Sequence, residues 1–146
     1  MALTTRLKAA EDGLLAALVA ETGLAGIPLR LGDPGAGVRP EHVWIAEEAT
    51  ASQLSDLSAQ TDGGREESFE LQVKVIVTRS GDDYAALRDR ATVLVQAIEH
   101  AVTNTRTLGG AVEDCEVIRI ERTTGATEIG RGILHVVAIE ARAWLV

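Results

Sequence analysis

The sequence predicts an α+β fold: a mostly antiparallel sheet of about four strands with two helices packed on one face. Residues 66–78 alternate apolar and polar side chains, which is typical of a strand with one buried face. Residues 3–21 and 82–103 instead repeat apolar side chains at spacings of three and four, which predicts two amphipathic helices. With 146 residues, 46% of them hydrophobic, residues 1–146 are expected to form a single domain with a core of ordinary size.

The first predicted helix, residues 3–21, has a narrow, alanine-rich apolar stripe, and Gly23 is a plausible stop signal. Residues 28–31 are a candidate for a short strand, and residues 42–46 are a better one. Between them, the Gly- and Pro-rich residues 32–37 predict a turn or loop. The first helix is therefore followed by two short strands.

Residues 47–64 are small, polar and acidic, and they predict a long loop. Leu54 and Leu57 are the only large apolar side chains in this segment, so it has little surface to bury. Loops longer than about 12–15 residues usually serve a function or are mobile. We therefore expect this loop to make contact with a partner.

The remainder of the chain predicts a strand, a long helix and two more strands. Strand 66–78 leads into helix 82–103, which starts with acidic capping candidates. Residues 112–122 are rich in β-branched side chains but alternate less regularly. Residues 123–126 predict a hairpin connection, and residues 127–145 predict a long final strand. The apolar face of strand 66–78 is expected to pack on the apolar stripe of helix 82–103.

The final strand has more apolar side chains than one buried face requires. Its first half, from Ile133 to Ile139, is apolar on both faces. We expect Leu134 and Val136 to be covered, together with Trp144, by the first helix or by an adjacent subunit, because tryptophan is enriched at the energetic centres of interfaces.

The charge distribution excludes several classes of function. The net charge is −8, and residues 41–70 contain eight acidic residues against one basic residue, Arg65, which gives that segment a net charge of −7. Proteins that grip nucleic acid usually carry a basic surface and aromatic side chains for stacking, whereas aromatic residues make up only 3% of this chain. The sequence has no run of about 18 apolar residues, which a membrane-spanning helix would need. Its N-terminus does not resemble a secretion signal.

The sequence offers little for catalysis or metal binding. His42, His100 and His135 are not spaced as metal ligands, and Cys115 lies between two acidic residues that would raise its pKa. A single cysteine fits a reducing cytoplasm. We therefore expect no enzyme activity, metal or cofactor. An enzyme that uses His135 or His42 remains an alternative.

The order of these elements resembles a known family. The segments concerned are Arg65–Val75, the helix start Gly81–Arg88, its continuation Leu94–Glu99, and Thr107–Gly110 ahead of a final hairpin. Together with the N-terminal helix, they resemble the tail terminator (tail completion) proteins of long-tailed bacteriophages with non-contractile tails. The resemblance covers nearly the whole chain.

This resemblance implies a virion protein that is made in the host cytoplasm and located at the head–tail junction. It implies a homohexameric ring that caps the tail-tube protein, stops growth of the tube and joins it to a head-side connector or stopper protein. Genome DNA would pass through the lumen during ejection without specific binding, and no enzyme activity, cofactor or membrane is expected.

The resemblance also gives the predicted loop a role. Leu54 and Leu57 would dock on a neighbouring subunit. The acidic side chains expected to face the lumen or a basic patch on the tail tube are Glu47, Glu48, Asp56 and Asp62. Two alternatives remain open: another head–tail joining subunit, such as a stopper, and a small dimeric α+β binding module.

Overall fold

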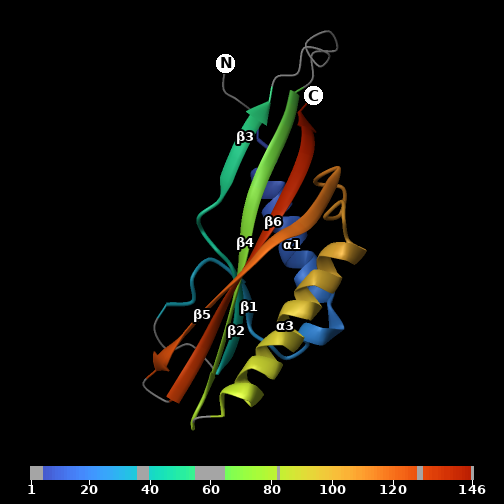
Figure 1. Ribbon diagram of the computed structural model, residues 1–146. Helices are drawn as coiled ribbons and strands as arrows, with labels where there is room; N and C mark the ends of the chain where they lie inside the picture. Colours follow the sequence, from blue (N-terminus) through green and yellow to red (C-terminus); the bar gives the residue numbers. More distant parts are fainter. Residues whose placement is uncertain (1–4, 36–39, 55–64, 82, 128–129, 146) are drawn as a thin grey trace.

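The computed structural model describes residues 5–35, 40–54, 65–81, 83–127 and 130–145. In this part of the chain a six-stranded mixed sheet carries two α-helices on one side (Figure 1). The strand order is β1-β2-β4-β6-β5. Strand β3 pairs with residues 66–70 of β4, next to residues 73–77, which pair with β2. The α+β class is confirmed, but the sheet has more strands than the predicted four.

The two α-helices are α1 (Leu7–Ala20) and α3 (Tyr84–Asn104), and a short 3₁₀ helix, η1 (Thr22–Leu24), follows α1. The strands are β1 (Leu29–Leu31), β2 (Glu41–Ile45), β3 (Thr50–Leu54), β4 (Arg65–Arg79), β5 (Asp114–Thr127) and β6 (Gly130–Leu145). Among the described residues, no helix has both the length and the apolar composition needed to cross a membrane.

The core lies between the helices and the centre of the sheet. Strands β4 and β6 pair antiparallel along their whole lengths, from Arg65 opposite Leu145 to Arg79 opposite Arg131. Every second side chain of β4 is buried on the helix side, as period-two alternation requires. The predicted packing is confirmed, because one buried cluster contains Phe69, Leu71, Val73, Val75 and Val77 of β4 and Leu87, Leu94, Val95 and Ile98 of α3.

Strand β1 runs parallel to β2, while the other pairings of the described strands are antiparallel, so the sheet is mostly antiparallel as predicted. Two sequence-based expectations are corrected. Residues 50–54 of the predicted loop form β3, while residues 55–64 lie outside the described residues. The first three side chains of β3 are exposed, so no apolar alternation marks the strand, and its backbone pairing with β4 defines it. Residues 123–126, predicted as a turn, are part of β5.

A β-bulge explains why residues 112–122 alternate irregularly. Val117 lies opposite Ile139 and Arg119 lies opposite Ala138, so Ile118 is an extra residue in β5. A bulge of this kind shifts the side-chain alternation of its strand by one residue. Cys115 and Val117 therefore share the helix side of the sheet with Ile120 and Arg122.

Two close contacts hold α1 in place, one to the sheet and one to the segment between α3 and β5. The carboxylate of Glu67, which is almost fully buried on β4, accepts a 2.7 Å hydrogen bond from the backbone N–H of Arg6 at the start of α1. A negative charge at this end of a helix is favourable. In the middle of α1, Gly13 lies so close to the chain at Leu108 that an added Cβ would be 2.2 Å from the Leu108 carbonyl oxygen.

Candidate assembly surfaces

One face of the sheet is not covered by the helices, and the first half of β6 supplies apolar side chains to it. Ile133, Val137 and Ile139 are buried on the helix side, so alternation directs Leu134 and Val136 to the opposite face. Both are half-buried. The expectation that α1 could cover these residues is therefore wrong, and coverage by an adjacent subunit remains a prediction.

The two tryptophans lie on this open face in different environments. Trp144, near the end of β6, is opposite Glu66 and 42% exposed. Trp44 on β2 is opposite Lys74 and only 8% exposed, and its ring makes an edge contact with His42 at a centroid distance of 6.0 Å. Trp44 thus packs within the sheet surface, whereas Trp144 is available as an anchor.

The open face also has a charged band across its middle. Glu70, Glu140 and Glu116 lie directly opposite one another on β4, β6 and β5. The guanidinium of Arg119 reaches over β6 to Glu70 at 2.7 Å and contacts Glu121 at 3.2 Å. Exposed ion pairs contribute little stability, so this band chiefly determines the charge of the surface.

Cys115 lines a hollow of about 300 Å³ between α3 and β5. The lining residues are Glu99, Val102, Thr103, Arg106, Cys115, Glu116 and Val117. Burial, and secondarily the charge of Asp114, raises the pKa of the Cys115 thiol to about 11. The thiol is therefore protonated at neutral pH, and a thiol in that state is a poor nucleophile.

The histidines do not meet at a common site. His100 is exposed on α3 and contacts Glu21 at 2.7 Å, whereas His42 lies beside Trp44 on the open face. His135 is buried on the helix side of β6. Among the described residues, no group of three histidine, cysteine, aspartate or glutamate side chains is arranged to hold a metal ion.

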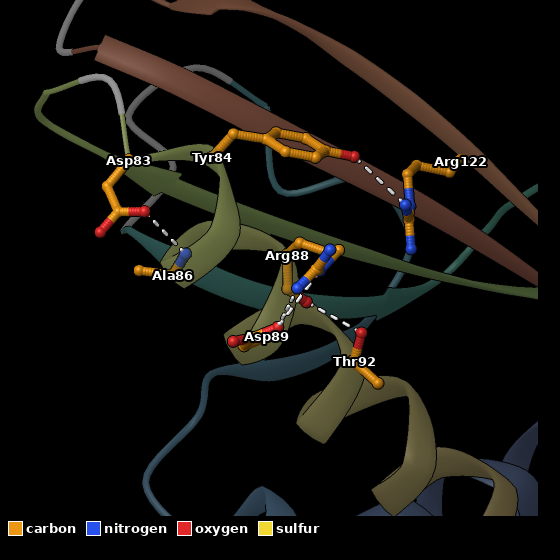
Figure 2. Close-up of polar contacts among 7 residues, drawn as sticks. All are labelled: Asp83, Tyr84, Ala86, Arg88, Asp89, Thr92 and Arg122. Atoms are coloured by element: carbon orange, nitrogen blue, oxygen red, sulfur yellow. Dashed lines mark hydrogen bonds and ion pairs between the residues drawn. The ribbon is translucent and has the colours of Figure 1, made fainter.

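A polar cluster that the sequence did not reveal surrounds Tyr84, the first residue of α3. Figure 2 shows the Tyr84 hydroxyl directed at Arg122 on β5, whose Nη1 donates a hydrogen bond of 3.2 Å to it. The Nε of Arg122 donates to Nε2 of His135 at 3.2 Å. The guanidinium of Arg131 lies over the Tyr84 ring, 5.5 Å from its centroid. Two arginines are thus held around one tyrosine, and we call Tyr84, Arg122, Arg131 and His135 the tyrosine cluster.

The contact with Arg122 defines the state of His135. Because an arginine Nε–H can only donate, Nε2 of His135 must be the acceptor, and the ring proton is on Nδ1. Burial, and secondarily the charge of Arg122, lowers the pKa of His135 below its ordinary value of 6.5. His135 is therefore neutral at physiological pH and acts as a fixed acceptor that orients Arg122.

This environment predicts a pH-dependent stability. The pKa of His135 is lower in the folded protein than in the unfolded chain, so the unfolded chain takes up its proton first. The free energy of unfolding should fall as the pH is lowered from about 6.5, the ordinary pKa of histidine. Denaturant titrations from about pH 7.5 to about pH 5, a range that spans the ordinary pKa of histidine, should show this loss of stability. The loss should be smaller in His135→Gln. Equal pH slopes for both proteins would contradict the assignment.

The residues predicted to mediate assembly are dispersed over the fold. Glu47 and Glu48 are exposed on the connection between β2 and β3, and Leu54 is the last residue of β3. Leu57, Asp56 and Asp62 lie outside the described residues. Leu134, Val136 and Trp144 share the open face. The structure thus groups the β6 residues on one surface and places the two glutamates at the opposite edge of the sheet from β5.

Comparison with known proteins identifies a shared fold. No protein-family model matches the sequence, and no match was found among curated proteins. Among solved structures, the chain is similar to a chain of the virion of a native gene transfer agent (GTA) particle, with a TM-score of 0.51 and 16% sequence identity. The similarity covers 96% of this chain and 90% of the other. The two chains therefore share essentially one whole fold.

Proposed function

We propose that this protein is a structural subunit of a phage-like virion, and specifically a tail terminator. The observation that carries the proposal is the end-to-end fold similarity to a chain of the gene transfer agent virion. Because that similarity extends over nearly all of both chains, it concerns the fold as a whole and not one part of it. The order of elements that resembles tail terminators in the sequence agrees with it.

The surfaces support a role in assembly. The open face combines Leu134, Val136 and the exposed Trp144, which is the composition expected of an interface. The net charge of −8 suits a ring through which DNA slides without adhering, because like charges weaken DNA contact. In this proposal, six copies cap the tail tube at the head–tail junction and present a surface to the head-side connector.

Deletion of the gene in a particle-producing strain tests the proposal. Without a terminator, tail tubes should grow beyond their normal length and remain separate from heads, and both effects should be visible by negative-stain electron microscopy. A plasmid copy of the gene should restore joined particles of normal tail length. Unjoined tails of normal length would favour the stopper alternative, and normal particles would refute a structural role in the virion.

A further inference from the structure

Among the described residues, Arg122 and Arg131 of the tyrosine cluster have no carboxylate partner, whereas four other arginines do. Arg88, Arg90, Arg106 and Arg119 each form an ion pair with an aspartate or glutamate. In contrast, the contacts of Arg122 are to a tyrosine hydroxyl and a neutral histidine, and that of Arg131 is to an aromatic ring. Within the described residues, two cationic groups are thus held together without an anion, in a protein whose net charge is −8.

The cluster holds Arg122 in a conformation suited to binding. Two of its five N–H donors are used by His135 and Tyr84, and the side chain is exposed, so the other donors are available. A planar guanidinium binds carboxylates through parallel hydrogen bonds. Because Arg122 and Arg131 are already positioned, little side-chain freedom remains to be lost on binding.

The position of the cluster indicates which carboxylate could reach it. Strand β5 forms one edge of the sheet, and its exposed Ile118 and Ile120 lie close to Arg122 in the strand. The opposite edge, formed by β1, has an exposed leucine, Leu31. Glu47 and Glu48 are exposed just after β2, the strand next to β1.

Both edges carry charges of both signs, since β5 also has Asp114, Glu116 and Glu121 and β1 has the exposed Arg30. The complementarity is therefore local: two arginines beside exposed isoleucines near one edge, and two exposed glutamates near the other. Two different complementary surfaces on one subunit allow head-to-tail contacts. Such contacts form a closed ring when the rotation from one subunit to the next brings the last subunit back to the first. The pairing would bury apolar groups beside ion pairs and fix the register of the two subunits.

We infer that the tyrosine cluster is a carboxylate-binding site, and that it receives Glu47 and Glu48 of the neighbouring copy in the ring. This inference rests on the proposed function and adds the contact that holds the ring together. The phosphates of DNA are a less suitable ligand, because the net charge of −8 opposes the approach of a polyanion.

Charge reversal at both edges tests the inference in the particle-producing strain. The variants are Arg122→Glu with Arg131→Glu, Glu47→Arg with Glu48→Arg, and all four substitutions together. Each two-residue variant should lower the yield of joined particles by at least about tenfold, because like charges meet across the contact. The four-residue variant should recover most of the yield, because the charges are complementary again.

A disulfide test reports the contact directly in purified particles. A chain with both Arg122→Cys and Glu48→Cys should give, under oxidising and non-reducing conditions, a ladder of linked subunits that ends at the size of the ring. Either single variant should give no ladder. Circular dichroism and thermal melting of the isolated variants show whether a loss of particle yield is due to misfolding. If a charge-reversal variant is misfolded, the disulfide experiment is the test of the contact.

Several results would overturn the inference while leaving the proposed function intact. They are a normal yield from both two-residue variants, no recovery in the four-residue variant, and no ladder in the double-cysteine chain. Joined particles that lack or lose DNA in the Arg122→Glu, Arg131→Glu variant would indicate a phosphate ligand and would also overturn it. Normal particles after deletion of the gene would instead refute the proposed function.

Discussion

Val73→Asp is expected to abolish folding into a soluble protein. Val73 is fully buried on the helix side of β4, between Ile45 of β2 and Val137 of β6, which are also fully buried. An unpaired carboxylate at this position would lose its hydration without gaining a partner, which costs several kcal/mol. Since domains are stable by only about 5–15 kcal/mol, most of the folded population should be lost. Soluble yield and thermal melting measure the effect.

Val73 is a better test position than Val75. Val75 lies opposite His135, and a carboxylate introduced there could be neutralised by protonation of that histidine. The matched control is Gln72→Asp, which places the same charge on the adjacent residue of β4 but on the open face, where Gln72 is only half-buried. The control should fold. Unchanged melting of Val73→Asp would refute the assignment of the core.

Gly13→Ala should destabilise the protein, although the same change normally strengthens a helix. In an exposed helix interior, alanine is better than glycine by about 1 kcal/mol. In this protein the new Cβ would be 2.2 Å from the carbonyl oxygen of Leu108, and a backbone atom cannot rotate away. The helix would have to separate from the segment at Leu108, and overpacking of this kind typically costs about 1–3 kcal/mol.

Leu108 has little freedom to accommodate the change. Its side chain is buried, and its backbone is in the left-handed region, with a φ of 48°. Chemical denaturation should show a lower free energy of unfolding for Gly13→Ala. Gly125→Ala is the control, because an added Cβ at Gly125 meets nothing within 4 Å and its stability should hardly change. A Gly13→Ala protein as stable as the wild type would show that α1 does not approach Leu108 this closely.

Sequence patterns predicted the parts of the fold whose side chains alternate between core and solvent. Strand β4 and helix α3 were found with bounds close to those observed, because each has one clearly apolar face. Strand β3 was missed because its exposed side chains lack such a face. Residues 123–126 were misassigned because threonine and glycine near a predicted hairpin suggest a turn, whereas pairing with β6 keeps them extended.

The candidate site was less predictable than the fold. Trp144, Leu134 and Val136 were recognised from their positions in the final strand. The tyrosine cluster joins residues that are far apart in the sequence, such as Tyr84 and Arg122, which are 38 positions apart, and no motif marks it. The cluster forms because the register of β5 against β6 places Arg122 opposite His135, and single-sequence patterns do not define that register.

That register has a further consequence, which comes from the extra residue Ile118. In a regular strand the side chains of residues 119, 121 and 123 would continue the helix-facing row of Cys115 and Val117, and Glu121 would approach the tyrosine of α3. The bulge instead presents Arg122 there. Whether Arg122 or Glu121 faces Tyr84 is thus decided by leaving Ile118 out of the regular pairing, and not by any residue of the cluster itself.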